Sequence, residues 1–254
     1  MNDINNLDIY NNRMRKSMED KLFFLNVLPE KINSFIDFGC ADGTLLAYVK
    51  EEMPNVLLYG IDMNKDMLDI ARKNVPSASF MCGDLPSCFF IPENKGSVLN
   101  LSSVLHEVYS YCTNERREEF WKSINDGNYE YVVIRDMIYN GGAMDRSPSH
   151  DIYNITTKAN SEQILDFQQN WGNICYYKNL VHFLLKYRYT ENWDREVKEN
   201  YLGYSTEDII KKLPKYDLIY RKDYILPYIY DTVKKDFDIE LKTPTHTNLI
   251  FKLK

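Results

Sequence analysis

The sequence lacks any long hydrophobic run, and its mean hydropathy is negative. No apolar stretch approaches the roughly 20 residues that a membrane-spanning helix needs. The first ten residues are polar and rich in asparagine, so they lack the basic and apolar regions of a secretory signal. These absences argue against a membrane-spanning or secreted protein, and we expect a cytoplasmic one.

Cysteine is also scarce, with five residues spread over 254. An odd number at wide spacing favours reduced thiols in a cytosol over a disulfide framework. No two cysteines form a CxxC pair and no histidine cluster completes a metal site, so we expect no metal ion. Aromatic residues, in contrast, are abundant: 20 Tyr, 12 Phe and 3 Trp provide ample material for a core and exclude disorder.

The net charge of −6 belongs mostly to one block of the chain. Residues 33–138 carry 9 basic and 16 acidic groups, whereas the flanking segments are close to neutral. A negative chain taken whole argues against a nucleic-acid binder. An acidic block beside a neutral remainder, however, does not exclude a polyanionic substrate.

Strand-like segments alternate with helix-like ones between residues 33 and 138. The expected strands are Ser34–Phe38, Val56–Asp62, Ala78–Cys82, Ser97–Leu101 and Tyr129–Asp136. The expected helices between them are Thr44–Met53, Lys65–Asn74 and Glu115–Ile124. This alternation predicts a parallel sheet that is covered on both faces.

The pattern changes after Tyr139. Met144–Asn154 is polar and is predicted to be a loop, and residues 161–212 are predicted to be mostly helical. Two more strands are expected at Asp217–Leu226 and Asn248–Leu253, with a short helix at Asp231–Phe237 between them.

These elements predict an α/β fold with a doubly wound, mostly parallel seven-stranded sheet of Rossmann-like type. Residues 33–138 and 213–254 form the α/β domain in this prediction. Residues 139–212 are a helical cap inserted after the fifth strand. Residues 1–32 are a helical flap, in which an amphipathic helix is expected over Tyr10–Leu28.

A glycine-containing turn follows the first expected strand. Gly39 allows a tight turn close to a ligand, and the next helix offers free N–H groups at its start. In a dinucleotide fingerprint a second glycine makes room for the pyrophosphate, and Ala41 stands in that place here. Asp37 would repel a diphosphate but suits a cationic amino-acid group. The charge therefore favours S-adenosylmethionine over a nicotinamide dinucleotide, with a plain strand-to-helix turn as the alternative.

Two further acids end the next two strands. Asp62 lies where a carboxylate can accept from both ribose hydroxyls, and Met63 follows in position to lie against an adenine face. Asp84 can accept from the adenine amino group, with Leu85 as an apolar contact. Each acid alone could be a solvated strand end or a helix cap. Ligands of such sheets bind beyond the carboxyl ends of the strands, where these acids are expected in register.

These residues together resemble the class I S-adenosylmethionine-dependent methyltransferases. The motifs that carry the resemblance are Asp37-Phe38-Gly39-Cys40-Ala41-Asp42-Gly43, Gly60-Ile61-Asp62, Gly83-Asp84-Leu85 and Asn100–His106. The resemblance implies that Gly39, Cys40 and Ala41 lie beside the methionine part of the cofactor. It likewise implies a place for Asp62 on the ribose and for Asp84 near the adenine. Ala41 departs from the glycine that the family frequently has at this position.

In this family the end of the fourth strand faces the sulfonium methyl, so Ser102 is expected beside the cofactor. Enzymes that methylate a base amine commonly have an Asp/Asn-Pro-Pro-aromatic run there, which this chain lacks. The pattern Ser102–His106 looks more like enzymes that act on small molecules, or on oxygen and nitrogen atoms of larger ones. His106 is the candidate general base, because an imidazole titrates near neutrality. It could instead be a buried histidine in an enzyme that needs only in-line positioning.

Three residues are candidates for contact with the acceptor. Arg135 closes the fifth strand and could grip a carboxylate or phosphate, or tether the insertion by an ion pair. His246 opens the last strand near the same sheet. Tyr153 belongs to the aromatic residues of the insertion, which are interleaved with basic ones. Such a set could clamp a nucleobase or form a helix core with snorkelling charges.

The sequence therefore predicts a methyltransferase that uses S-adenosylmethionine as its cofactor. The predicted acceptor is a small molecule under the cap, methylated on oxygen or nitrogen. RNA is a different target within the same class, suggested by the neutral-to-basic second half of the chain. A non-catalytic cofactor-binding partner protein and a nicotinamide oxidoreductase are the alternatives from other classes.

Overall fold

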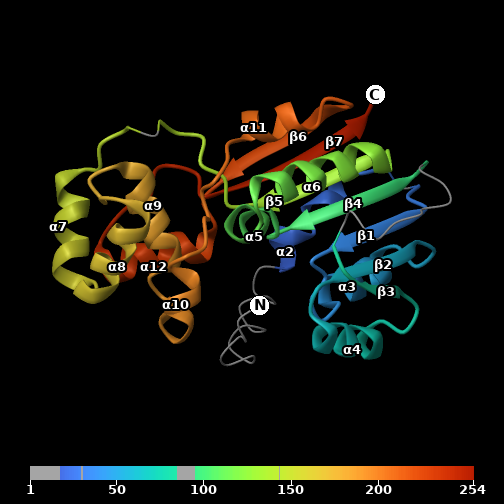
Figure 1. The fold of residues 1–254 in the computed structure, drawn as a ribbon, viewed down its shortest axis with the longest axis horizontal. Coiled ribbons are helices and arrows are strands. Elements are labelled where there is room, and N and C mark those ends of the chain that lie inside the picture. Colours follow the sequence, from blue (N-terminus) through green and yellow to red (C-terminus); the bar gives the residue numbers. More distant parts are fainter. Residues whose placement is uncertain (1–17, 30, 85–94, 143) are drawn as a thin grey trace.

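The computed structural model describes residues 18–29, 31–84, 95–142 and 144–254. The strands within these ranges are β1 (Ser34–Phe38), β2 (Leu57–Asp62), β3 (Ser79–Cys82), β4 (Ser97–Ser102), β5 (Tyr131–Asp136), β6 (Tyr216–Tyr224) and β7 (His246–Leu253). They form one sheet in the order β3-β2-β1-β4-β5-β7-β6 (Figure 1). β1 to β5 run parallel, and β7 is antiparallel to both of its neighbours. The predicted doubly wound, mostly parallel seven-stranded sheet is confirmed.

Helices cover both faces of this sheet. They are α2 (Met18–Lys21) with the 3₁₀ turn η1 (Phe23–Asn26), α3 (Thr44–Glu52), α4 (Lys65–Asn74), α5 (Leu105–Tyr111), α6 (Asn114–Gly127) and α11 (Thr206–Lys212). Asn64 begins α4 by accepting from the N–H groups of Asp66 and Met67, and Thr113 begins α6 in the same way. No helix in the described ranges is long and apolar enough to cross a membrane.

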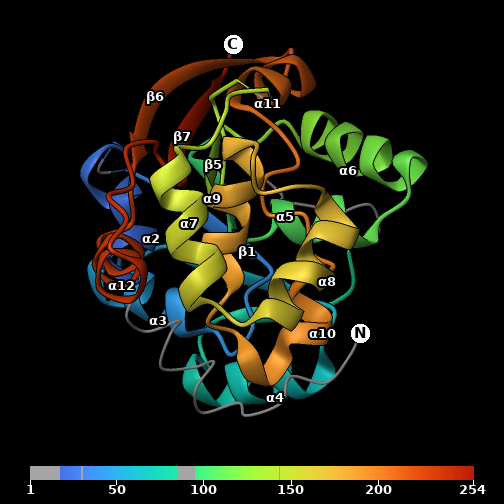
Figure 2. The same ribbon diagram turned by 90° about the vertical axis from the view of Figure 1, so that its left-hand side faces the viewer.

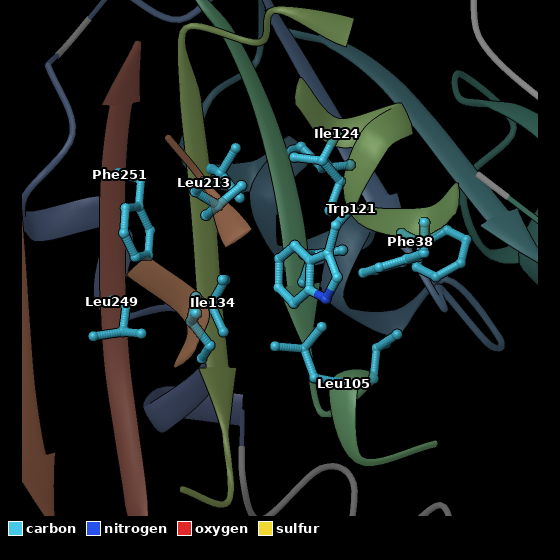
Figure 3. Packing of buried hydrophobic residues seen from close by; sticks show 14 of the residues in the cluster. Phe38, Leu105, Trp121, Ile124, Ile134, Leu213, Leu249 and Phe251 are labelled. Carbon is cyan, nitrogen blue, oxygen red and sulfur yellow. The ribbon is translucent and has the colours of Figure 1, made fainter. Parts of the chain in front are cut away.

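Two apolar cores lie on the two faces of the sheet. Every residue of β1 is buried, as expected for a central parallel strand. Its side chains alternate between the cores, with Phe35 packed beside η1 and α3, and Ile36 on the side of α5 and α6. On the second face, Trp121 and Ile124 of α6 pack over the strands (Figure 3). The sheet is thus a rigid platform whose carboxyl edge carries the polar residues described below.

A second group of helices lies beyond the carboxyl ends of the parallel strands. These helices are α7 (Ser149–Lys158), α8 (Ser161–Trp171), α9 (Tyr177–Lys186), the 3₁₀ turn η3 (Thr190–Asn192), α10 (Trp193–Glu196) and α12 (Pro227–Phe237). The arrow of β4 points toward them in Figure 1, and they stand in front of the sheet in Figure 2. We call residues 144–202 and 225–241, which contain these elements, the helical part.

The helical part has an apolar core of its own. Phe167 of α8 and Phe183 of α9 are fully buried in it, together with Val233 and Phe237 of α12. Because α12 comes from between β6 and β7, two separate stretches of chain build this core. The division of the chain into flap, α/β domain and cap stays a prediction.

Two local predictions differ from the structure. The segment predicted as a loop contains the start of α7, which follows Pro148. Asp151 in its first turn and Lys158 in its last turn suit the helix dipole, and Ile155 is buried, so a polar sequence still forms a packed helix. The helix expected over Tyr10–Leu28 is seen only in part, because residues 1–17 lie outside the described ranges. From residue 18 on, the chain forms the short α2 and η1 instead of one continuous helix.

Candidate cofactor and active site

A row of polar side chains lies at the carboxyl ends of β1 and β4. Asp37 is buried and accepts a hydrogen bond from Asn100 Nδ2 at 2.8 Å. Ser102 donates its hydroxyl to Asn100 Oδ1 at 3.1 Å. Burial raises the pKa of Asp37 to about 7, although Asn100 and Lys21 of α2 oppose the rise. A buried carboxylate needs a cationic partner, so this place suits an ammonium group.

The turn after β1 uses left-handed backbone at Gly39, Ala41 and Gly43. Gly39 has a φ of 77°, and a Cβ at this position would lie 2.5 Å from Val104 Cγ2, so only glycine fits. Ala41 has a φ of 44°, a conformation that costs a residue with a side chain roughly 1–2 kcal/mol. The turn keeps this strained geometry at the edge where a ligand would approach, as is common at functional sites.

Asp62 is held by the same turn. Its Oδ2 accepts from the backbone N–H of Ala41 at 3.0 Å, and its Oδ1 accepts from that of Asn64 at 2.8 Å. Each oxygen keeps a further lone pair, and the residue is half-buried, so a diol can still approach it. Met63 beside it is 66% exposed, whereas Cys40 is buried in the core. Asp62 and Met63 therefore form an open surface next to the glycine turn.

Asp84 follows β3 and forms an ion pair with Arg116 of α6. Both side chains are partly exposed. The charge of the Asp84 carboxylate is therefore shared with a guanidinium that the sequence pattern did not indicate. Leu85 lies outside the described residues.

A buried carboxylate at the end of β5 organises the start of α5. Asp136 accepts from the backbone N–H groups of Leu105 and Met137, each at 2.8 Å. Its Oδ1 lies 2.9 Å from His106 Nδ1. Burial lowers the pKa of His106, but Asp136 outweighs this effect and the pKa rises to about 9. The imidazole is therefore mostly protonated at neutral pH and forms a buried ion pair.

The other ring nitrogen of His106 faces the helical part. Its Nε2 lies 4.0 Å from Oε2 of Glu199, a buried residue that follows α10. Glu199 Oε1 accepts from the Tyr111 hydroxyl and from Arg195 Nε, both at 2.9 Å. Arg195 also donates to Glu107 Oε1 at 3.0 Å. These contacts attach the helical part to α5, directly after the end of β4.

A fully buried lysine holds the same segment from within the helical part. Lys186 Nζ donates to the carbonyl oxygens of Glu196 and Glu199, both at 2.6 Å, and lies 4.5 Å from the centre of the Tyr201 ring. Burial lowers the pKa of Lys186 to about 7. This lysine fixes the backbone that carries Glu199, so the carboxylate beside His106 has a defined position.

The three predicted acceptor contacts lie in different places. Arg135 is buried and donates to Asp20 of α2 at 2.6 Å and to Ser103 Oγ at 2.8 Å. His246 is buried, and burial together with the nearby charges of Arg135 and His106 lowers its pKa well below the usual value. Tyr153 is 66% exposed on α7, which stands on the far side of the helical part from the sheet (Figure 1).

The structure thus gathers most predicted residues along one edge and leaves Tyr153 away from it. Three functional candidates were missed from the sequence: Asp20, Lys21 and Glu199. Lys21 had the weak signal of a cation in the predicted flap, but nothing in the spacing linked it to Asp37. Glu199 lies 93 residues after His106, and only the packing of α10 against α5 brings the two together.

A cavity of about 500 Å³ lies elsewhere in the molecule, among the start of α7, the start of α9 and the segment around the end of α12. Its lining carries charges of both signs, including Arg146, Asp151, Lys234 and Glu240. None of the predicted site residues lines it. The described part of the chain also contains no group of three or more His, Cys, Asp or Glu residues that could hold a metal ion.

Comparison with known proteins supports the interpretation of this edge. Residues 35–126 match the family model described as a methyltransferase domain. Over 107 residues the chain is 28% identical to an uncharacterized protein of Rickettsia prowazekii (strain Madrid E). This match covers 41% of the chain and 42% of that protein, so it spans less than half of the relative.

Solved structures with the same fold cover nearly the whole chain. A S-adenosylmethionine-dependent methyltransferase from Mesorhizobium loti is 16% identical, with a TM-score of 0.53 over 90% of this chain and 95% of that one. The magnesium protoporphyrin IX methyltransferase from Synechocystis PCC 6803, with bound S-adenosylhomocysteine, is 10% identical. Its TM-score is 0.52 over 100% of this chain and 90% of that one.

At such low sequence identity, the structural similarity shows the fold alone. The family model adds a match in sequence over residues 35–126, which include all but the first residue of β1 and the strands β2 to β4. Both agree with the motifs at Gly39, Asp62 and Asp84. Residues 35–126 therefore match a methyltransferase domain, and the chain as a whole has the fold of S-adenosylmethionine-dependent methyltransferases.

Proposed function

We propose that this methyltransferase transfers its methyl group to an oxygen or nitrogen atom of a small molecule held between the strand ends and the helical part. The cofactor lies along the carboxyl ends of β1 and β2 in this proposal. Asp37 and the turn at Gly39 hold its methionine end, and Asp62 holds its ribose. The sulfonium methyl faces the end of β4, beside Ser102.

The observation that carries the proposal is the attachment of the helical part to α5. Arg195 and Glu199 bond to Glu107 and Tyr111, immediately beyond the end of β4. Because the helical part is bonded at this place, it can enclose a small acceptor at the end of β4. A polymer such as RNA would instead need an open surface along the strand ends. The structural neighbour that methylates magnesium protoporphyrin IX is consistent with a small acceptor.

His106 is the proposed general base, and its surroundings decide when it can act. Asp136 holds Nδ1, so Nε2 is the atom that would take a proton from the acceptor. With a pKa of about 9, the imidazole must first lose its own proton. A base role therefore requires a rate that rises with pH up to about 9. A rate set only by in-line positioning has no such requirement.

RNA as the acceptor has less support, because the aromatic and basic residues of the helical part are used inside it. The indole of Trp171 donates to the Val197 carbonyl, and the Tyr187 hydroxyl donates to Asp236 at 2.7 Å. Lys186 is fully buried, and Arg195 is bonded to two glutamates. These residues form a core with internal ion pairs, which leaves little of the set to stack on or clamp a nucleobase.

Turnover with acceptor pools tests this proposal. The protein is incubated with S-adenosylmethionine and fractionated metabolites or RNA, and release of S-adenosylhomocysteine is followed against a reaction without acceptor. We expect release with at least one metabolite pool. The small-molecule assignment would be contradicted if S-adenosylhomocysteine were released only with the RNA pool, and if the affinity of the protein for RNA fell steeply as the salt concentration rises. Cofactor binding without release in any pool would favour a non-catalytic binding protein.

A further inference from the structure

The cavity in the helical part has the size of a small-molecule site. Its volume is about 500 Å³, within the roughly 300–1,000 Å³ that ligand pockets occupy. It is lined by members of residues 145–151 and 234–243, together with Tyr177 at the start of α9. None of the residues that the proposed methyl transfer uses is among them. An organic molecule can therefore enter here, and the chemistry of the lining decides which kind.

One wall of this cavity is held in a fixed position. Residues 145–147 pair with residues 174–177 through two backbone hydrogen bonds of 2.8 and 2.9 Å. The buried Ser147 adds a third bond of 2.6 Å from its hydroxyl to a carbonyl oxygen of the same stretch. Between these bonds, the guanidinium of Arg146 lies 4.7 Å from the centre of the Tyr176 ring. This wall is thus preorganised, so a ligand that binds to it does not have to order the backbone first.

The four acids of the lining already have partners within the protein. Lys234 Nζ lies 3.1 Å from Asp238 Oδ1 and 2.9 Å from Glu240 Oε1. Asp145 accepts a hydrogen bond of 2.9 Å from a backbone N–H. Asp151 lies in the first turn of α7, where the helix dipole favours a negative charge. The carboxylates therefore offer little to a cationic ligand.

Four donor groups of the lining are left without a polar partner. Among the residues that the structure describes, neither Arg146 nor Lys242 forms an ion pair, and the side-chain hydroxyls of Tyr177 and Thr243 form no hydrogen bond. Two of these groups carry a positive charge. A guanidinium can donate two parallel N–H bonds to a carboxylate or phosphate, and an ammonium adds a compact charge. The groups that remain available to a ligand thus favour an anion.

We propose that this cavity binds a small organic anion through its carboxylate or phosphate group. Arg146 and Lys242 bind the charged group in this site, and the hydroxyl of Thr243 donates a further hydrogen bond to it. The organic part of the ligand packs against Tyr177 and Pro148. Because the acids of the lining are paired within the protein, the ligand needs no accompanying cation. The site is separate from the proposed cofactor edge, so it does not depend on the proposed function.

Aromatic probes that differ in charge test the proposal. Binding of benzoate, phenyl phosphate, the neutral benzamide and the cationic benzylammonium is measured by ligand-observed NMR for the wild type, Arg146→Gln and Lys242→Gln. We expect the wild type to bind at least one anion about tenfold or more tightly than the neutral and cationic probes. The tighter of the two anions identifies the preferred charged group. Each variant should weaken the binding of that anion about fivefold or more.

The matched control is Lys73→Gln, at an exposed lysine of α4, which should bind the probes as the wild type does. Arg146 and Lys242 are also exposed, so their variants are expected to fold. Equal binding of benzamide and the anions, or no binding of either anion, would overturn the proposal. A preference for benzylammonium would mean that the acids are the available groups, again against it. Anion affinities that stay unchanged in both variants would place the anion elsewhere on the protein and contradict this site.

Discussion

Replacing Asp37 by Asn is expected to stabilise the free protein and to weaken cofactor binding at the same time. The pKa of Asp37 is raised from 3.8 to about 7 in the folded chain, mainly by burial. Ionisation of Asp37 therefore costs stability as pH rises from about 4 to 7, and the full cost remains above pH 7. Asn has nearly the same shape and can still accept from Asn100 Nδ2. At pH 8 the variant should gain on the order of 4 kcal/mol in unfolding free energy.

Denaturant unfolding at pH 8 and at pH 4 measures this difference. The gain should nearly vanish at pH 4, because Asp37 is then mostly protonated in the folded wild type. Affinity for S-adenosylhomocysteine should fall at least about tenfold, since a charged partner of the ammonium is lost. Asp194→Asn, at an exposed acid on α10, is the matched control and should change neither quantity. A variant that is less stable at pH 8 yet binds normally would contradict the role of Asp37.

Replacing His106 by Asn is expected to remove a large part of the pH dependence of stability. The pKa of His106 is raised from 6.5 to about 9, so protonation stabilises the fold. This contribution is fully present below about pH 6.5 and is lost as pH rises through about 9. The wild type should therefore lose on the order of 3 kcal/mol over this window relative to His106→Asn. Asn can keep a hydrogen bond to Asp136 but cannot carry the charge.

Unfolding free energies at several pH values between 6 and 9.5 measure the effect. His150→Asn, at an exposed histidine of α7, is the control and should follow the wild type. Parallel curves for the wild type and His106→Asn would show that the ion pair with Asp136 does not exist in solution. The same variant tests the base: a role in proton transfer predicts a loss of about 100-fold or more in kcat. An unchanged kcat would leave His106 as a structural ion pair.

The sheet could be predicted because its signals are local. Ser34–Phe38 is a short apolar run before a glycine turn, and its bounds as β1 match the prediction. Lys65–Asn74 was likewise predicted to the residue, because Leu68 and Ala71 recur at helical spacing. In the structure Asn64 caps this helix as well. Asp62 could be placed because the chain direction of a parallel sheet brings the ends of successive strands to one edge.

The rest of the site depends on contacts that the sequence does not encode locally. Lys21 and Asp37 are separated by η1 and the approach to β1, and only the packing of α2 on the strand ends joins them. Arg116 reaches Asp84 across 32 residues. Glu199 reaches His106 from the other half of the chain. The sequence alone leaves open whether aromatic and basic residues of the helical part face a ligand or a core. In the structure Trp171, Lys186 and Tyr187 pack in or against the core, a result that only tertiary packing determines.

Calorimetric titration of the wild type with S-adenosylhomocysteine and with NAD tests the central claim most directly. Asp37, the strained turn at Ala41 and the half-buried Asp62 together favour a nucleoside that carries a zwitterionic amino acid over one that carries a diphosphate. We expect one molecule of S-adenosylhomocysteine to bind per chain and NAD to produce no saturable signal. Saturable binding of NAD without binding of S-adenosylhomocysteine would contradict the assignment of this edge as a methyl-donor site.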